Sequence, residues 1–441
     1  MSNVEKIANK PIVIQSAYSL EGKKVDLRIE SGVISDLSEA GSLKASDVDV
    51  INAEGLQLLP GLVDLHTHLR EPGREDAETV RSGSAAAALG GFTAVHAMAN
   101  TEPVADTAGV VEQVVRLGRK AGYCDVFAVG AVTQGLNGAQ LAELGAMAHS
   151  MANVKVFSDD GKCVFDSLVM RRALEYVKQF DGVIAQHAQD PRLTENAQMN
   201  EGVVSARLGL AGWPAVAEEA IIARDVLLAE HVQARLHICH VSTAGSVEII
   251  RWAKARGIKV TAEVTPHHLL LTDSAAESYN PVFKVNPPLR TERDVQALRT
   301  ALVDGTIDIV ATDHAPHPKE SKECEWSEAA CGMVGLETAL SVVQESIIES
   351  GLSNWKTIAE RMSTAPAKIG RLTHHGLGIT KGAPANIVLY DTAARRTVSE
   401  IRSASKSMNN PYFDRTLPGQ VMYTFLHGNL VVAKGDLVNP L

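Results

Sequence analysis

The chain has 441 residues, 45% of them hydrophobic and 21% charged, which is typical of a globular protein with material for a large core. Its net charge of −10 argues against a nucleic-acid-binding protein, which normally presents a basic face. A small anionic substrate is not excluded, because one local arginine can outweigh a distant negative surface. The length allows two or three domains, or one large barrel with an appendage.

Neither a targeting segment nor a membrane span is predicted. Residues 1–10 are polar, and no run approaches about 18 uninterrupted apolar residues. The five cysteines are scattered, odd in number and without a CxxC pair, which favours a reduced, cytoplasmic protein. Cys239 lies in an apolar run and is expected to be a small core residue.

Both ends of the chain are predicted to consist of short strands separated by turns. These strands are expected at 11–15, 24–29 and 32–37, and again at 386–390, 421–426 and 429–433. Two strand-rich ends around a different middle predict one small β domain, built from residues 1–60 together with 377–441.

The middle of the chain, 61–376, alternates between apolar runs and alanine-rich segments with helical periodicity. Eight parallel strands are the number that closes a (β/α)8 barrel, so an α/β fold of this type is predicted. An open doubly wound sheet would need a glycine-rich phosphate loop, which Gly61, Gly90-Gly91 and Gly130 do not form. The strands are expected at 61–66, 93–98, 125–130, 153–157, 183–186, 235–239, 258–263 and 307–312, and helices at 78–89, 139–148 and 215–229, among others.

Barrel enzymes carry their chemistry at the carboxyl ends of the strands. The first strand ends in DLHTHLREPGRE (64–75), where His66 and His68 are two apart and point to the same face. Neutral imidazoles on that face could share a metal ion, although two histidines stacked in a polar core are an alternative.

Four later strand ends also deliver side chains that bind metal or transfer protons. Five of eight strand ends doing so exceeds a random scatter of 15 histidines, so metal binding is predicted. The four segments are KVFSDDG (155–161), IAQHAQD (184–190), HICHVSTAG (237–245) and IVATDHAPH (309–317).

This ordered set resembles the amidohydrolase superfamily, and its finer wording resembles the bacterial dihydroorotases. The resemblance covers nearly the whole chain, through PGLVDLHTHLREPG, ANTEP, VFSDDG, KVNPPLR, TDHAPH and SKSMNNPYF. It implies a zinc-dependent hydrolase that interconverts L-dihydroorotate and N-carbamoyl-L-aspartate in pyrimidine biosynthesis. The metal ligands that it implies are His66, His68, Asp160, His187, His240 and Asp313.

The bridging ligand and the number of zinc ions stay open. Asp160 is favoured over Asp159 because its spacing of 27 residues to His187 matches the family pattern. Many amidohydrolases use a carbamylated lysine here, and Lys155 would be that residue if the strand register differed. One or two zinc ions are expected per chain, with two favoured, because a carboxylate can bridge two ions without modification.

Asp313 is the expected catalytic residue. Zinc lowers the pKa of a bound water to about 7, and a neighbouring carboxylate can accept its proton and then protonate the departing ring nitrogen. A role as a plain ligand or as a helix cap is the alternative.

Arg70 is the expected carboxylate clamp of the substrate. It follows the histidine pair by two residues, and its planar fork suits bidentate binding. A surface salt bridge is the alternative, and Arg74 and Arg290 are ranked lower, as structural arginines. The resemblance adds His68, Asn100, Asn286, His317, Cys331 and Gly332 as substrate contacts.

Several positions depart from the family pattern or allow other interpretations. Three positions differ from the residues that are usual in the family: Ala99 replaces a proline, Gln189 an acidic residue, and Cys331-Gly332 a phenylalanine-glycine pair. Each is expected to alter the wall of the pocket or the loop beside it. The segment 319–335 is expected to be a lid or a disordered loop. His237 is expected to be structural, and His374-His375 a solvated turn.

Two other functions remain open. Dihydropyrimidinases and allantoinases are related hydrolases, but Arg70 and Asn286 both favour the dihydroorotase form. A catalytically silent barrel that assembles with aspartate transcarbamoylase is disfavoured because all six ligand positions are filled. For an active enzyme, a small-molecule substrate is expected, and the resemblance allows a homodimer and an association with aspartate transcarbamoylase.

Overall fold

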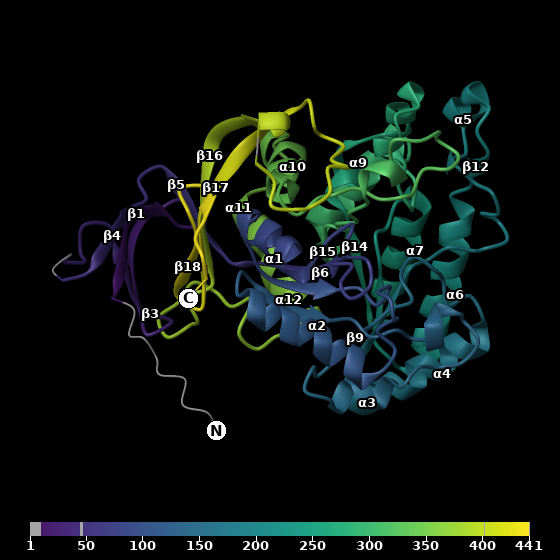
Figure 1. The fold of residues 1–441 in the computed structure, drawn as a ribbon, viewed down its shortest axis with the longest axis horizontal. Helices are drawn as coiled ribbons and strands as arrows, with labels where there is room; N and C mark the ends of the chain where they lie inside the picture. Colours follow the sequence, from purple (N-terminus) through teal and green to yellow (C-terminus); the bar gives the residue numbers. More distant parts are fainter. Residues whose placement is uncertain (1–9, 45–46, 401, 441) are drawn as a thin grey trace.

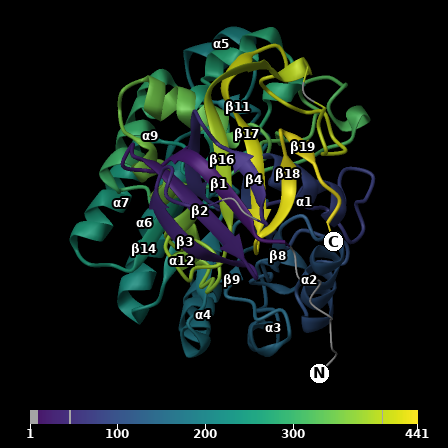
Figure 2. The ribbon, with the colours of Figure 1, turned by 90° about the vertical axis from the view of Figure 1, so that its left-hand side faces the viewer.

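Strands from both ends of the chain form one mixed sheet in the computed structural model, which describes residues 10–44, 47–400 and 402–440. The sheet runs in the order β19-β18-β17-β16-β5-β1-β2-β3, and β4 pairs with β1. Figure 2 shows its N-terminal strands, in purple, beside its C-terminal strands, in yellow. Its strands are β1 (Ile12–Tyr18), β2 (Lys24–Glu30), β3 (Val33–Glu39), β4 (Asp49–Asn52), β5 (Leu56–Pro60), β16 (Ile387–Thr397), β17 (Thr416–Leu426), β18 (Asn429–Ala433) and β19 (Asp436–Leu437).

The two ends of the chain meet where β5 pairs antiparallel with β16, with Val388 opposite Leu59. Both ends also supply the apolar core of the sheet, in which Ile14 and Leu27 lie in one cluster with Phe425. The prediction of a β domain built from both termini is therefore confirmed. The β16–β17 hairpin is longer than predicted, because its polar outer half, at 391–397 and 416–420, has no apolar run to indicate a strand.

Eight parallel strands form the barrel, each close to a predicted run. β6, β7 and β8 form one sheet and the other five form a second, in the order β15-β14-β13-β10-β9. Parallel bridges close the circle, from Gly130 to Phe157 and from Thr67 to His314. The strands are β6 (Leu62–Thr67), β7 (Phe92–Ala97), β8 (Asp125–Ala128), β9 (Val156–Phe157), β10 (Val183–Gln186), β13 (Leu236–Ile238), β14 (Val260–Val264) and β15 (Ile309–Val310).

Helices between the strands surround the barrel, which lies beside the terminal sheet in Figure 1. Their starts follow ordinary capping chemistry: the Asp166 carboxylate accepts the backbone N–H groups of Leu168 and Val169, both at 2.9 Å. The helices are α1 (Val80–Leu89), α2 (Ala108–Ala121), α3 (Leu144–His149), α4 (Ser167–Val177), α5 (Val203–Leu208), α6 (Val216–Val232), α7 (Ala244–Ala255), α8 (Pro266–Leu270), α9 (Glu292–Asp304), α10 (Ala339–Val343), α11 (Trp355–Ala359) and α12 (Ala365–Ile369). A short ladder, β11 (Met199–Asn200) with β12 (Gly212–Trp213), lies between α4 and α6 in the chain.

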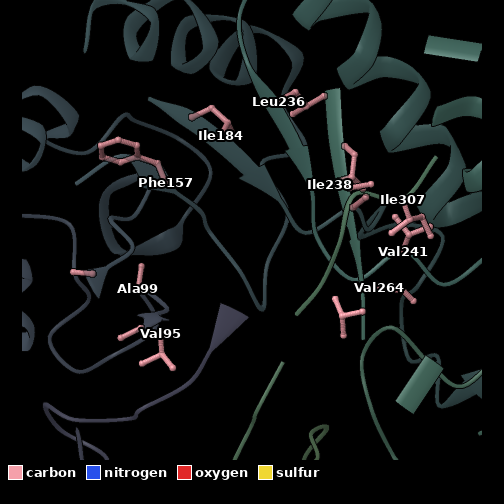
Figure 3. Close-up of a cluster of buried hydrophobic side chains, with 14 of the residues drawn as sticks. Val95, Ala99, Phe157, Ile184, Leu236, Ile238, Val241, Val264 and Ile307 are labelled. Atoms are coloured by element: carbon pink, nitrogen blue, oxygen red, sulfur yellow. The ribbon is translucent and has the colours of Figure 1, made fainter. Parts of the chain in front are cut away.

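Alternate residues of the barrel strands pack on opposite faces. Ile184 of β10 and Leu236 of β13 belong to the large cluster that also includes side chains of the helices, part of which Figure 3 shows. Val183 and Ala185, the neighbours of Ile184, pack in a separate small cluster with Cys239. Burial on both faces explains why these strands read as continuous apolar runs.

None of the helices in the described part of the chain has the length and apolar character needed to cross a bilayer. Residues 1–9, which make up most of the polar segment at the N-terminus, lie outside the described residues.

Candidate active site

Six predicted side chains meet where the barrel strands end. His66 is the fifth residue of β6, His187 follows β10 directly, and His240 follows β13 by two residues. Asp160 and Asp313 each come three residues after the end of their strands, β9 and β15. The structure thus brings together the side chains that were predicted from the carboxyl ends of five strands, together with His68 just beyond β6.

Asp160 is the centre of this cluster. Its Oδ1 atom lies 3.3 Å from His66 Nε2, 3.2 Å from His187 Nδ1 and 3.2 Å from His240 Nε2. Its Oδ2 atom lies 3.3 Å from His68 Nε2. Burial alone would raise the pKa of Asp160, but the charge of His66 and hydrogen bonds with His187 and His240 hold it well below its ordinary value.

Asp313 closes the cluster on the side of His66 and His68. Its Oδ1 atom lies 3.0 Å from His68 Nε2 and 3.4 Å from His66 Nε2. Burial would raise the pKa of Asp313, but the charges of His66 and His68 and a hydrogen bond with His68 lower it to about 2. The carboxylate is therefore ionised at neutral pH and able to accept a proton.

The two alternatives to Asp160 point elsewhere. Asp159 accepts the backbone N–H groups of Val132 and Thr133 at 2.8 and 2.9 Å, and it also accepts the Thr133 hydroxyl. Lys155 donates its Nζ to the Phe180 carbonyl at 3.1 Å, near the amino end of β9. Of the three candidates, only Asp160 faces the histidines.

The partners of each histidine fix which nitrogen faces the cluster. His66 Nδ1 lies 2.6 Å from a Glu263 carboxylate oxygen, which only accepts, so that nitrogen carries a proton. His68 Nδ1 lies 2.9 Å from Asn100 Oδ1. In the neutral form of both rings, the Nε2 lone pair then faces the carboxylates of Asp160 and Asp313.

The Asp160 and Asp313 carboxylates face the Nε2 atoms of His66 and His68. A positive charge, from protons or from a metal ion, must therefore lie between them. Burial alone would lower the pKa of His66, but Asp160, Glu263 and Asp313 raise it well above its ordinary value. His66 Nε2 is nevertheless buried without a hydrogen-bond partner in the described part of the chain. His66, His68 and Asp160 form one group of ligand atoms within 4.8 Å of one another, and Asp160, His187 and His240 form a second. The donor set fits a divalent metal ion, and Asp160 belongs to both groups.

His187 is oriented by Gln189, one of the departures from the family pattern. Gln189 Oε1 lies 2.8 Å from His187 Nε2 and accepts Asn286 Nδ2 at 3.0 Å, while its amide nitrogen donates to Thr194 at 2.8 Å. His187 therefore turns Nδ1 toward Asp160. One amide links a candidate ligand to a candidate substrate contact, a role that the sequence did not reveal.

Arg70 lies at the rim of the cluster, with φ of +61°. Its Nε donates to the Pro316 carbonyl at 3.1 Å, and within the described residues its two terminal nitrogens make no hydrogen bond. Burial lowers the pKa of Arg70 to about 10, so the guanidinium is charged at neutral pH. Its terminal fork is available for an anionic ligand.

Asn286 and His317 carry polar atoms with different partners. Asn286 Oδ1 is buried and, among the described residues, has no hydrogen-bond partner. His317 Nε2 lies 2.8 Å from the Cys331 carbonyl, which only accepts. Burial, together with the charges of Arg70 and Lys322, lowers the pKa of His317 to about 3, so its ring is neutral at neutral pH.

Gly332 permits a close approach in the loop that carries Cys331. With φ of +149°, it sits where a Cβ atom would lie 2.7 Å from His317 Nε2 and 2.9 Å from the Ala315 carbonyl oxygen. Asn409, from the C-terminal part of the chain, donates to the Ala315 and Gly332 carbonyls at 2.9 and 3.1 Å and accepts the His317 backbone N–H at 3.2 Å. The SKSMNNPYF motif therefore holds this loop in place.

The segment 319–335 is packed rather than disordered. Lys322 is 7% exposed and donates to the backbone carbonyls of Lys284, Ala330 and Gly332. Lys284 in turn donates to the carbonyls of Trp326 and Ser327. In this structure the segment forms a fixed wall beside Gly332.

Two buried groups that the sequence did not assign to the site lie beside the cluster. Glu263 of β14 bridges His66 and His237, whose Nε2 lies 3.0 Å from it, and His237 is structural as expected. His267, at the start of α8, has a buried Nε2 without a partner in the described part of the chain, and burial lowers its pKa to about 4. Glu263 is a carboxylate inside an apolar strand, which was the signal available.

Comparisons with known proteins agree with this geometry. The profile of the Dihydro-orotase-like family matches residues 55–246. A dihydroorotase of Streptomyces coelicolor is 66% identical over 96% of this chain and 99% of its own length. Those of Leifsonia xyli and Mycobacterium tuberculosis are 62% and 53% identical, over 98% and 95% of this chain and 98% and 97% of their own. The chain belongs to the dihydroorotase family.

Several solved structures have the same fold as this chain. L-hydantoinase (dihydropyrimidinase) from Arthrobacter aurescens aligns with a TM-score of 0.84 at 24% identity, over 97% of each chain. Dihydropyrimidinase from Brevibacillus agri aligns with a TM-score of 0.82 at 22% identity, over 98% of this chain and 96% of its own. At this level of identity the similarity shows the fold alone: this chain shares with them a barrel and a β domain.

Proposed function

We propose that this member of the dihydroorotase family interconverts L-dihydroorotate and N-carbamoyl-L-aspartate in pyrimidine biosynthesis. The proposal rests on four histidines that converge on Asp160, on Asp313 against two of them, and on the Arg70 side chain, whose terminal nitrogens make no hydrogen bond within the described residues. Full-length relatives named dihydroorotase, up to 66% identical, support the same reaction.

Zinc is the proposed metal, with two ions favoured over one. His66, His68, Asp160 and Asp313 would hold one ion, and Asp160, His187 and His240 the other. Bound zinc supplies Lewis acidity for the ring carbonyl and lowers the pKa of a water to about 7. Support comes from the mixed imidazole and carboxylate donors, which suit zinc.

Asp313 is the proposed proton carrier. Its ionised carboxylate would accept a proton from the attacking water and deliver it to the departing ring nitrogen. His240 and Asp313 have φ angles of +30° and +45°, which are rare for such residues and are typical of positions that the surrounding structure holds in place for function.

Arg70 is the proposed clamp for the substrate carboxylate, since its terminal nitrogens match a carboxylate in a bidentate pair. Asn286 Oδ1 would accept a ring N–H, because it is buried and, in the described chain, unpartnered. His68, Asn100, His317, Cys331 and Gly332 complete the proposed contacts with substrate.

Other parts of the proposal concern organisation. The proposed bounds are 1–60 with 377–441 for the β domain and 61–376 for the barrel. A cytoplasmic location, a homodimer and association with aspartate transcarbamoylase remain predictions. Light scattering after size-exclusion chromatography, with and without aspartate transcarbamoylase, measures both kinds of assembly.

Replacing Arg70 tests the substrate assignment. Losing one partner of a buried charge pair costs about 2–5 kcal/mol, so Arg70→Ala should lower kcat/KM for dihydroorotate roughly 30- to 4,000-fold while metal content stays unchanged. Arg74→Ala is the matched control, because Arg74 lies in the same loop and is half exposed beside Asp76. Unchanged turnover by Arg70→Ala would refute the clamp.

A further inference from the structure

A second cluster of histidine and carboxylate side chains lies at the other end of the barrel. Asp125 is the first residue of β8, so it lies at the amino end of the parallel strands. His375 follows α12, and His427 lies in the turn between β17 and β18 of the terminal sheet. The cluster thus joins the underside of the barrel to the sheet that faces the viewer in Figure 2.

Both imidazoles point at the same carboxylate oxygen. His375 Nε2 lies 2.8 Å from Asp125 Oδ2, and His427 Nε2 lies 2.7 Å from it. The two ring centroids are 5.5 Å apart. All three ligand atoms lie within 4.8 Å of one another, close enough for small side-chain shifts to place them around a single small cation.

The surrounding residues hold these rings as outer groups hold the ligands of a metal site. Thr93 Oγ1 lies 3.1 Å from His375 Nδ1, and Asn386 Nδ2 lies 3.3 Å from it. Asn386 Oδ1 also accepts the backbone N–H of His427 at 2.6 Å. In the tautomer with a proton on Nδ1, His375 donates to Thr93 Oγ1, and its Nε2 lone pair faces Asp125, where an ion would lie.

His375 is buried, unlike its neighbour in the chain. The ring was expected in a solvated turn, but its side chain is 1% exposed, so that prediction was wrong for His375 although His374 is exposed. A buried imidazole that faces a carboxylate and a second imidazole has the donor types of a metal site.

An ion has a route to this cluster. A cavity of about 400 Å³ is lined by Asp125, His374 and His375. Three cationic side chains also line the cavity, Arg119, Lys155 and Arg371; of these, Lys155 donates to the Phe180 carbonyl and Arg371 pairs with Asp181 at 2.7 Å. The side chains of Asp125 and His427 are 37% and 40% exposed, so water can complete the coordination.

We propose that Asp125, His375 and His427 bind a divalent transition metal ion, with zinc the best match, at a site separate from the active site. Two imidazoles and one carboxylate, with water as a fourth ligand, form a donor set that zinc accepts. Because its ligands come from the barrel and from the terminal sheet, the ion fastens one to the other. An ion that binds only the folded chain raises its stability.

Metal content tests the site directly. Full-length protein is stripped with a chelator and dialysed to equilibrium against buffered free Zn²⁺, and zinc per chain is measured for wild type and His427→Ala. The variant should hold one equivalent less than wild type, whatever the active site holds, and should keep its dihydroorotate turnover. His149→Ala, which removes an exposed histidine of α3, should match wild type.

Asp125→Asn guards against a trivial loss through misfolding, because it keeps the side-chain shape and removes the charge. It should also hold one equivalent less, and zinc should raise its thermal unfolding midpoint less than that of wild type. Equal zinc content in wild type, His427→Ala and Asp125→Asn would overturn the proposal and leave only a hydrogen-bonded contact. A failure of the proposed reaction would appear in turnover instead, which this cluster does not control.

Discussion

Two clusters of the same residue types lie at opposite ends of one barrel, and they differ in how the chain builds them. The upper cluster, around Asp160, draws its ligands from strand ends, and all six of its side chains are at least 94% buried. The lower cluster, around Asp125, has two half-exposed members, Asp125 and His427, and His427 comes from the terminal sheet. The upper cluster is shielded from water and lies beside Arg70, which can bind an anionic substrate, so it is suited to catalysis. The lower one is equipped to join two parts of the fold.

Removal of metal should have the largest effect and should separate the clusters. A chelator is expected to abolish dihydroorotate turnover by wild type. Without metal, the side chains of the upper cluster bind protons, and no Lewis acid is left to polarise the ring carbonyl. Zinc should restore the same rate to wild type and to His427→Ala. Full turnover by protein shown to be metal-free would contradict a metal role in catalysis.

Matched substitution of one carboxylate in each cluster sharpens the contrast. Asp313→Asn should lower kcat by about 10²–10⁴, the usual contribution of general acid–base catalysis. Asp125→Asn, the same change in the lower cluster, should leave kcat within about twofold, because Asp125 lies at the amino end of β8, the opposite end of the barrel from the active site. If Asp313→Asn retained full kcat, another proton carrier would have to be sought.

Each cluster is also organised by an amide, and this offers a third comparison. Gln189→Leu removes the acceptor of His187 Nε2 and Asn286 Nδ2, so metal affinity or turnover should fall roughly 10- to 100-fold. Asn386→Leu removes the corresponding group below and should spare turnover. Zinc affinity is measured by competition with a chelator and turnover by steady-state kinetics; no change in either for Gln189→Leu would rule out its positioning role.

The smallest effect is expected in the loop beside His317. A Cβ atom at Gly332 would lie 2.7 Å from His317 Nε2, so Gly332→Ala should raise KM for dihydroorotate several-fold, the scale of about 1 kcal/mol. Zinc content should not change. The opposite pattern, lost zinc with an unchanged KM, would place this loop with the metal ligands rather than with the substrate.

Much of the architecture was accessible from sequence because buried parallel strands are apolar on both faces. All eight predicted barrel runs overlap a strand, and both strand-rich ends join one sheet. The polar half of the β16–β17 hairpin was missed, since its residues carry no apolar alternation. Closure of the barrel between Thr67 and His314 also depends on tertiary pairing that periodicity does not encode.

The site was accessible to the extent that its residues stand at strand ends. Spacing favoured Asp160, and the structure turns Asp159 toward the Val132 and Thr133 backbone instead. Glu263 was not recognised as an orienting group because its partner His66 is 197 residues away in the chain, and a glutamine two residues after His187 does not by itself indicate that it orients that ring. His375 was misread for the same reason: a local polar segment gave no sign that Asp125 and Asn386 enclose it.

Turnover of three related rings distinguishes a dihydroorotase from hydrolases of other cyclic amides. Purified protein of known zinc content should be assayed with L-dihydroorotate, dihydrouracil and allantoin side by side. We expect turnover of L-dihydroorotate alone, lost on chelation and restored by zinc. Turnover of dihydrouracil or allantoin with none of L-dihydroorotate, or no turnover by zinc-loaded protein even with aspartate transcarbamoylase added, would contradict it.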